Sequence, residues 1–342
     1  MRLSFSFIGK LHLIGDEMEK LKVAFYWAAS CGGCEIAVLD INEKILDVLQ
    51  LADIVFWPVA MDIKYKDVEN MPDKYIDVCF FNGGIRNSEQ EHMAKLLRQK
   101  SKILIAYGAC AHLGGVPGLA NISNRKEIFE KVYGTTFSTV NPEKITPKPK
   151  VKVKEGELEI PEFYDTVRTL DQTVEVDYYV PGCPPAVERT LYAVEVIAKG
   201  ELPPKGSVLA PLKSVCDECP RKKENKKISK IYRVYEKTPE PERCLLEQGI
   251  LCMGPATRGG CGARCLKADM PCTGCGGPCP NSPEQGAAMI SALASILGLE
   301  EEKEKYTEEE VEKLISQVKD PLGTFYMYAL PASILRRKVM KE

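Results

Sequence analysis

Residues 21–35 read L-K-V-A-F-Y-W-A-A-S-C-G-G-C-E. A short apolar run typical of a strand leads into a glycine turn, and residues 36–49 then carry apolar side chains at helical spacing. Gly32 and Gly33 permit backbone conformations that leave the thiols of Cys31 and Cys34 facing the same point. Open α/β sheets bind their ligands where the strands end, so this turn is a candidate site.

Further apolar runs of strand type follow along the chain, with helical patterns between them. Ser88 and Glu91 have the spacing of a capping box, which predicts the start of one of these helices. The alternation predicts an α/β fold, a flavodoxin-like doubly wound parallel sheet in residues 21–200. The expected strands span residues 53–60, 76–81, 102–107 and 174–180.

Cysteines follow two of these strands as well. Cys110 comes after the strand at 102–107, and Cys183 comes after the strand at 174–180. Because the carboxyl ends of parallel strands meet at one edge of a sheet, the thiols of Cys31, Cys34, Cys110 and Cys183 should be available there together. Four thiolates suit a 4Fe–4S cluster.

Two features of this first half fall outside the cysteine pattern. Cys79 lies inside a strand rather than after one, and we predict a buried core thiol. Residues 135–170 interrupt the alternation of strands and helices, and their alternating K-V-K-V-K predicts a hairpin or a substrate-side excursion.

The composition changes near Gly200. Residues 201–211 have the Pro and Gly content of a linker, and cysteines then replace the periodic apolar pattern, so residues 201–299 are predicted to form a second, mostly irregular or helical domain. Residues 261–279 read C-G-A-R-C-L-K-A-D-M-P-C-T-G-C-G-G-P-C, with too few apolar side chains for a core. Such loops hold iron–sulfur clusters, while zinc and disulfide bonds are the alternatives.

Composition bears on these alternatives. The chain has fourteen cysteines and a formal net charge of −2, and its first residues do not read as a secretory signal. We therefore expect a cytoplasmic protein, because a reducing compartment favours metal binding over disulfides. The balanced charge predicts no nucleic-acid partner, and no apolar run approaches the length of a membrane span.

The remaining segments carry little chemistry. Residues 1–20 are expected to form an N-terminal arm, residues 283–299 a capping helix and residues 300–342 a charged tail. The basic run at 221–230 is predicted to be a solvated face, with docking of an acidic partner as the alternative.

Short motifs in both halves give the chain a resemblance to the small, electron-transferring subunit of nickel–iron hydrogenases. The nearest members are cytoplasmic archaeal hydrogenases of the type that does not reduce deazaflavin and is associated with heterodisulfide reductase. The gamma subunit of the deazaflavin-reducing enzyme is the neighbouring alternative. The motifs are C-G-G-C-E at 31–35, G-A-C-A-H-L-G-G at 108–115, P-G-C-P-P at 181–185, R-C-L-L-E-Q-G at 243–249, G-P-A-T at 254–257 and P-C-T-G-C at 271–275.

The resemblance implies three 4Fe–4S clusters. The proximal cluster, nearest to the nickel–iron centre, would be bound by Cys31, Cys34, Cys110 and Cys183. The medial cluster would be bound by Cys261, Cys265, Cys272 and Cys275, and the distal cluster by Cys216, Cys219, Cys244 and Cys252. Many relatives have proline in place of Cys265 and hold a 3Fe–4S cluster there. Cys279 fits the cysteine spacing of bacterial ferredoxins and is the alternative medial ligand.

The resemblance also implies the partners. Dihydrogen would be split at a nickel–iron centre on a separate large subunit, and electrons would leave to an iron–sulfur or flavin subunit, in the heterodisulfide reductase system. Glu35 is a candidate proton relay, and a solvated or helix-N-terminal carboxylate is its plainer interpretation. His112 is expected to donate a hydrogen bond to the cluster or to be packed.

Two rival classes remain at this point. One is a zinc-binding interaction protein without redox chemistry, which would use the same cysteine spacing. The other is the related cluster subunit of a quinone-reducing complex, which resembles only the first domain.

Overall fold

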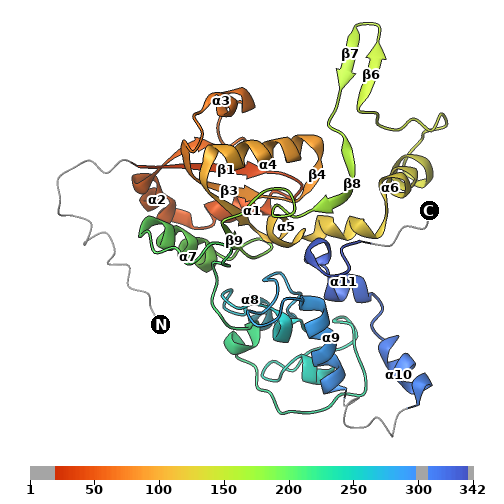
Figure 1. Ribbon diagram of the computed structural model, residues 1–342. Coiled ribbons are helices and arrows are strands. Elements are labelled where there is room, and N and C mark those ends of the chain that lie inside the picture. Colours follow the sequence, from red (N-terminus) through yellow and green to blue (C-terminus); the bar gives the residue numbers. More distant parts are fainter. Residues whose placement is uncertain (1–19, 298–306, 338–342) are drawn as a thin grey trace, which may run out of the picture.

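The computed structural model describes residues 20–297 and 307–337 (Figure 1). Its centre is a five-stranded parallel sheet with the order β2-β1-β3-β5-β9, the flavodoxin-like order. This confirms the predicted doubly wound sheet. Apart from residue 20, the expected N-terminal arm lies outside the described residues. The strands are β1 (Leu21–Trp27), β2 (Ala52–Phe56), β3 (Ile76–Asn82), β5 (Ser101–Tyr107) and β9 (Tyr178–Val180).

Two strands are shorter than predicted. β2 ends at Phe56 because the next residues form a turn, in which the carbonyl of Trp57 accepts hydrogen bonds from two following backbone amides at 2.9 and 2.8 Å. β9 begins only at Tyr178, and Val174 lies in a turn with its amide bonded to the carbonyl of Leu170 at 2.9 Å. Both shortened strands still end close to the edge of the sheet at which the cysteines were predicted to gather.

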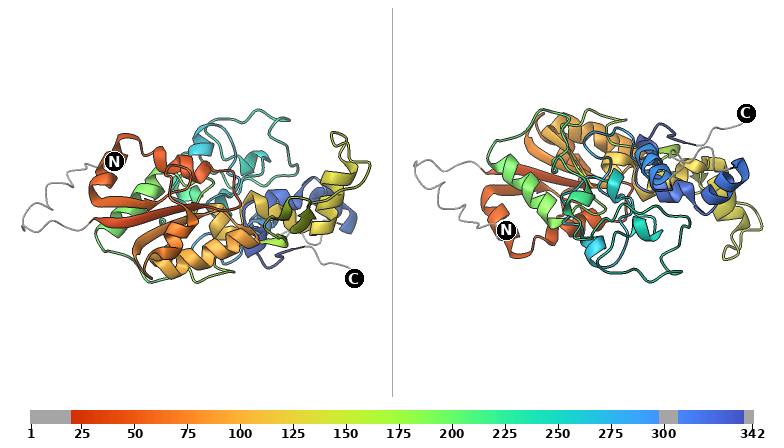
Figure 2. Two further views of the ribbon diagram at one scale, coloured as in Figure 1. Left: turned by 90° about the horizontal axis from the view of Figure 1, so that it is seen from above. Right: turned by 90° about the horizontal axis from the view of Figure 1, so that it is seen from below.

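Helices cover both faces of the sheet (Figures 1 and 2). On one face, α1 (Gly33–Leu39) and α7 (Val187–Ala198) pack Val38 and Val196 against Phe25 and Phe80. On the other, α3 (Tyr65–Asn70) and α4 (Ser88–Lys100) pack Val68, Met93 and Leu97 against Tyr26 and Phe81. Cys79 is fully buried in the second cluster, as predicted. The apolar residues of alternate strand positions thus fill two separate layers.

α4 begins at Ser88, the residue that was predicted to be its cap. Asn87, not Ser88, is the N-cap residue, and it exchanges hydrogen bonds with Gln90 rather than Glu91. Ser88 instead accepts a hydrogen bond from the amide of Glu162 at 2.9 Å. The capping-box assignment was therefore shifted by one residue, because Asn and Ser both suit the cap position.

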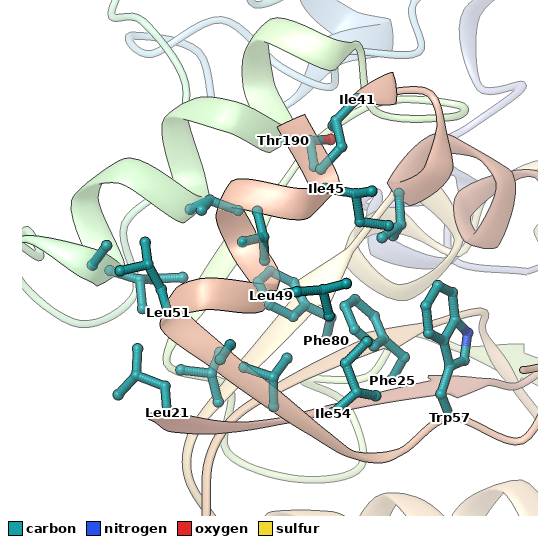
Figure 3. A pocket seen from close by; sticks show the side chains of 18 of the residues that line it. Leu21, Phe25, Ile41, Ile45, Leu49, Leu51, Ile54, Trp57, Phe80 and Thr190 are labelled. Carbon is teal, nitrogen blue, oxygen red and sulfur yellow. The ribbon is translucent and has the colours of Figure 1, made fainter. Parts of the chain in front are cut away.

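The face under α1 also carries α2 (Ile45–Leu51), which buries none of its residues. Figure 3 shows an apolar pocket between this helix and the sheet, lined by Ile45 and Leu49 of α2 and by Phe25, Trp57 and Phe80. No cysteine occurs among the described residues that line it. The pocket is therefore separate from the candidate metal sites.

The segment between β5 and β9 holds short elements at the edge of the first half. It contains the predicted hairpin, formed by β6 (Lys150–Val153) and β7 (Gly156–Glu159). The segment also contains β8 (Phe163–Arg168), which pairs antiparallel with β4 (Ile85–Asn87), a strand that precedes β5 in the chain. The remaining elements here are α5 (Ala109–Leu113), η3 (Val116–Ile122), α6 (Arg125–Phe129) and η4 (Glu130–Thr135).

The second half is built from short helices and irregular segments around its own apolar cluster, which includes Leu245, Ile250, Met253 and Met289. The predicted capping helix is α9 (Gln285–Ile296). No helix among the residues described here has the length and apolar character needed to span a membrane. The other elements are η5 (Val215–Glu218), η6 (Leu246–Gln248), η7 (Gly254–Ala256), α8 (Arg264–Lys267), α10 (Glu308–Ile315), α11 (Pro321–Phe325) and η8 (Leu330–Ala332).

The C-terminal residues are not simply a charged tail. Phe325 and Leu330 are buried in the cluster of the second half, and the carbonyl of Pro331 accepts a hydrogen bond from Gln172 of the first half at 2.8 Å. Asn121 likewise donates to the carbonyl of Arg336 at 3.2 Å. Figures 1 and 2 show this blue segment returning to the first half beside α6. Residues 321–337 therefore tie the two halves together.

Candidate metal centres

The thiols predicted at the edge of the sheet do gather there. Cys31 and Cys34 flank the turn between β1 and α1, Cys110 lies in α5 directly after β5, and Cys183 follows β9. Burial raises the pKa of the Cys34 thiol, and the neighbouring thiols of Cys110, Cys183 and Cys31 raise it further. Burial also raises the pKa of Cys110 to about 12 and that of Cys183 to about 11. We call these four residues the proximal group.

Glycine makes room for the proximal group. Gly108 has a φ of +89°, and a Cβ there would lie 2.3 Å from the sulfur of Cys34. A side chain at Gly108 would therefore both strain the backbone and fill the space in front of the thiol. Cys31 is exposed, while Cys34 and Cys110 are buried, so the group opens toward the surface at one corner.

A second set of thiols lines a cavity between α8 and the segment 271–276. The cavity wall includes Cys261, Cys265, Cys272 and Cys275, which we call the medial group. Cys279 is not among the lining residues, and its thiol donates to the carbonyl of Pro255 at 3.3 Å. The fold therefore brings Cys265, rather than Cys279, together with the other three cysteines.

The third set also lines a cavity. Cys216, Cys219, Cys244 and Cys252 form its thiol wall, and we call them the distal group. A Cβ at Gly254 would lie 3.2 Å from the sulfur of Cys216 and 3.5 Å from that of Cys252, so both thiols face the same stretch of backbone. The cavity is lined as well by Lys223, Lys226 and Lys227 from the basic run.

Most of the basic run is exposed, as a solvated face requires, but Arg221 is buried. Its guanidinium pairs with Asp269 and donates to the carbonyl of Leu266 at 3.1 Å. The expectation of a solvated face was therefore wrong for Arg221, because this side chain fastens the distal loop to α8.

The three groups follow one another in contact. Burial raises the pKa of the Cys275 thiol and the backbone amide of Cys183 counteracts this effect, while burial and then the Cys275 thiol raise the pKa of Cys183, so the proximal and medial groups lie next to each other. The amide of Cys272 donates to the sulfur of Cys252 at 3.4 Å, which joins the medial group to the distal one. The twelve thiols are thus arranged in series rather than as one cluster.

The medial cavity combines thiols with a buried cation. Within residues 20–297 and 307–337, no three side chains of Cys, His, Asp or Glu are arranged to bind a single metal ion. The medial cavity is lined by Arg189, whose Nε is buried without a hydrogen-bond partner. Thiol-lined cavities with a buried cation beside them suit a bulky anionic group, such as an iron–sulfur cluster with its thiolates.

Two polar side chains near the proximal group are buried. Glu35 accepts hydrogen bonds from the indole of Trp57 and from Asn82, and burial raises the pKa of its carboxyl group against the effect of these two donors. Glu35 is therefore not solvated, but it does lie in the first turn of α1, as the helix-N-terminal interpretation predicted. His112 packs on Tyr179 with ring centroids 4.6 Å apart, and its Nδ1 has no partner among the described residues. It is a packed side chain, as expected.

The sequence patterns did not reveal the arginines at the junction of the two halves. Arg189 and Arg258 are both buried, and the carbonyl of Arg258 accepts a hydrogen bond from Arg189 at 2.9 Å. The only local signal was a lone arginine within an apolar helical pattern at residues 187–198, a position that ordinarily faces solvent.

Comparison with known proteins identifies the family. A family model described as the 20 kDa subunit of NADH ubiquinone oxidoreductase matches residues 31–197. The iron–sulfur subunit of the F420-non-reducing hydrogenase of Archaeoglobus profundus is 44% identical over 327 residues, which span 94% of this chain and 99% of that protein. The chain belongs to this family of hydrogenase iron–sulfur subunits. The resemblance found in the motifs is confirmed.

Another member of the same family, a subunit of the F420-non-reducing hydrogenase of Methanothermobacter marburgensis, is 39% identical over 95% of this chain and 99% of its own length. A chain in the crystal structure of an NAD+-reducing NiFe hydrogenase in the H2-reduced state is 25% identical, with a TM-score of 0.45, over 53% of this chain and 93% of that chain. The family model ends at residue 197, whereas the two archaeal relatives cover both halves. The alternative of a cluster subunit from a quinone-reducing complex, which resembles only the first half, is thereby excluded.

Proposed function

We propose that this chain is the electron-transferring subunit of a nickel–iron hydrogenase and that it holds three 4Fe–4S clusters. The observation that supports this most directly is the serial arrangement of the thiols, in which Cys183 lies near Cys275 and the amide of Cys272 bonds to the sulfur of Cys252. Iron–sulfur clusters carry electrons at reduction potentials that the surrounding protein sets. A series of three clusters would therefore conduct electrons through the protein.

The ligand assignment is part of the proposal. The proximal, medial and distal groups would each supply four thiolates, and Cys279 would supply none. Glycine at position 108 and the thiol-lined medial and distal cavities support this assignment, because they leave room for a cluster core beside the sulfur atoms. Binding would require the loss of the thiol protons, which burial disfavours until iron is present.

A large subunit with the nickel–iron centre would cover the proximal group. There the oxidation of one dihydrogen would release two protons and two electrons, and the electrons would enter the proximal cluster one at a time. Exposed apolar side chains near Cys31, namely Trp27, Ile36 and Leu39, support a protein interface at this corner. Glu35 would take up or pass on protons beside it.

The distal group would deliver electrons to an acceptor. We propose an iron–sulfur or flavin subunit of the heterodisulfide reductase system in the cytoplasm as this acceptor. The exposed lysines around the distal cavity support an acidic docking surface on it.

Isolation of the native complex tests the proposal. We expect mass spectrometry to find a nickel-containing large subunit, and metal analysis to find about twelve iron and twelve acid-labile sulfide atoms per copy of this chain in addition to those that its partners hold. Zinc in place of iron and sulfide would overturn the proposal and favour the non-redox interaction protein. Reduction of deazaflavin by the complex would instead favour the deazaflavin-reducing alternative.

A further inference from the structure

Arg189 sits where the two halves of the chain meet. It lies near the start of α7, six residues after Cys183, and is only 2% exposed. Its Nη1 donates to the carbonyl of Pro181 at 2.9 Å, and its Nη2 donates to the carbonyls of Arg258 and Gly259 at 2.9 and 2.7 Å. All of these acceptors are neutral backbone oxygens.

No carboxylate forms an ion pair with Arg189 in the part of the chain that the structure describes, although the charge of Arg189, like that of Arg264, helps to lower the pKa of Glu188 against the effect of burial. The adjacent Glu188 forms its ion pair with Arg264, at 2.8 Å. The Nε of Arg189 is also buried without a hydrogen-bond partner. Burying an uncompensated cation is costly, so an anion is expected nearby when the protein is in its working state.

The medial cavity is the place for that anion. Arg189 lines it together with the four thiols of the medial group. Burial raises the pKa of Cys275, and the amide of Cys183 and the charge of Arg189 both counteract this effect. A Cβ on Gly276 would lie 3.0 Å from Nη2, and one on Gly260 would lie 3.2 Å from Nε. The absence of side chains at these two positions leaves room for the guanidinium.

We propose that Arg189 is the charge partner of the medial cluster and that it holds the reduction potential of this cluster above the value that four thiolates alone would give. This inference rests on the proposed function. Reduction adds one electron to the cluster and makes it more negative, so a fixed cation beside it stabilises the reduced form. The electron would come from the proximal cluster and pass on to the distal one, with no bond made or broken.

The location of Arg189 explains why the effect should be large. The side chain is shielded from water, so its charge acts through a low local dielectric. Arg264 provides a matched comparison, because it lines the same cavity but is exposed and paired with Glu188. Its charge should be screened and its influence on the cluster weak.

The test is a potentiometric titration of the intact complex, followed by electron paramagnetic resonance. The variants are Arg189→Gln, Arg189→Lys and Arg264→Gln, and the medial signal is identified as the one that Cys265→Pro alters. We expect Arg189→Gln to shift the medial midpoint potential to lower values, with the other two signals moving less. Arg189→Lys, which keeps the charge, and Arg264→Gln should stay near the wild-type potential.

An unchanged medial potential in Arg189→Gln would overturn the inference while leaving the proposed function intact. Equal shifts in Arg189→Gln and Arg189→Lys would also overturn it, because the effect would then follow the hydrogen bonds and not the charge. If Arg189→Gln fails to assemble, a wild-type potential in Arg189→Lys supports the inference and a shifted one overturns it. Absence of iron and sulfide from the wild-type complex would instead refute the proposed function itself.

Discussion

The indole nitrogen of Trp57 donates a hydrogen bond to the carboxylate of Glu35, which is buried directly beside Cys34. Asn82 donates to the other carboxylate oxygen, and the same amide donates to the carbonyl of Tyr26 at 3.0 Å. Burial disfavours the charged form of Glu35, while the two donors favour it. The carboxylate is thus held in place while burial favours its protonated form and the two donors favour its charged form. This balance suits a group that exchanges protons.

Glu35→Gln tests this role. Glutamine keeps the size of the side chain but neither gains nor loses a proton, so dihydrogen oxidation by the complex should fall about 100-fold or more. The cluster spectra should not change. Glu43→Gln, an exposed glutamate of the same half, is the control and should keep full activity. Full activity in Glu35→Gln would remove the residue from the proton path.

Cys265→Pro should convert the medial 4Fe–4S cluster to a 3Fe–4S cluster, because only three thiols would remain around the cavity. Electron paramagnetic resonance of the oxidised complex detects this change. Cys279→Ser is the control, since its thiol contacts Pro255 outside the cavity lining. A 3Fe–4S signal in Cys279→Ser, with none in Cys265→Pro, would exchange the two assignments.

Gly108→Ala should prevent assembly of the proximal cluster, since its Cβ would lie 2.3 Å from the sulfur of Cys34. We expect the complex to lose about four iron and four sulfide atoms per copy of this chain. Gly206→Ala separates this contact from backbone strain, because Gly206 has a similar φ of +85° and no atom within 4 Å of the added Cβ. Equal iron loss in both variants would show that strain, and not the thiol contact, is responsible.

Asp177 should stabilise the sheet at the edge opposite the metal centres. It is fully buried, with Arg98 and Lys205 each 2.6 Å from its carboxylate, so Asp177→Asn should cost about 3–5 kcal/mol in the free energy of unfolding. Asp53→Asn, which removes an exposed pair with Lys20, should cost less than about 1 kcal/mol. Chemical denaturation measures both, and equal losses would contradict the prediction.

The same variant has a defined pH dependence. Burial would raise the pKa of Asp177, but Arg98, Lys205 and the amide of Leu104 together lower it below its ordinary value of 3.8. A lowered folded-state pKa contributes stability above the unfolded-state value and loses it as the pH falls through the folded-state value. The difference between wild type and Asp177→Asn should therefore be complete near neutral pH and shrink below pH 3.8. A difference that grows on acidification would contradict this sign.

Local patterns were sufficient for much of the first half. The apolar runs, the glycine turns and the cysteines that follow the strands predicted the sheet and the proximal group, because each is a short-range consequence of side-chain spacing. Strand ends and the helix cap were shifted by a few residues, as at Phe56 and Asn87, since several neighbouring residues suit those positions equally well.

The sequence by itself determined which residue types were available: twelve thiols in the spacing of a known family, a parallel sheet to position four of them, and a glycine-rich loop for four more. Only the tertiary structure decided that Cys265 joins the medial cavity and Cys279 does not, that Arg189 is buried against it, and that residues 321–337 tie the two halves together. These outcomes depend on contacts between segments far apart in the chain. Their free energy comes from burial and packing, which local spacing does not encode.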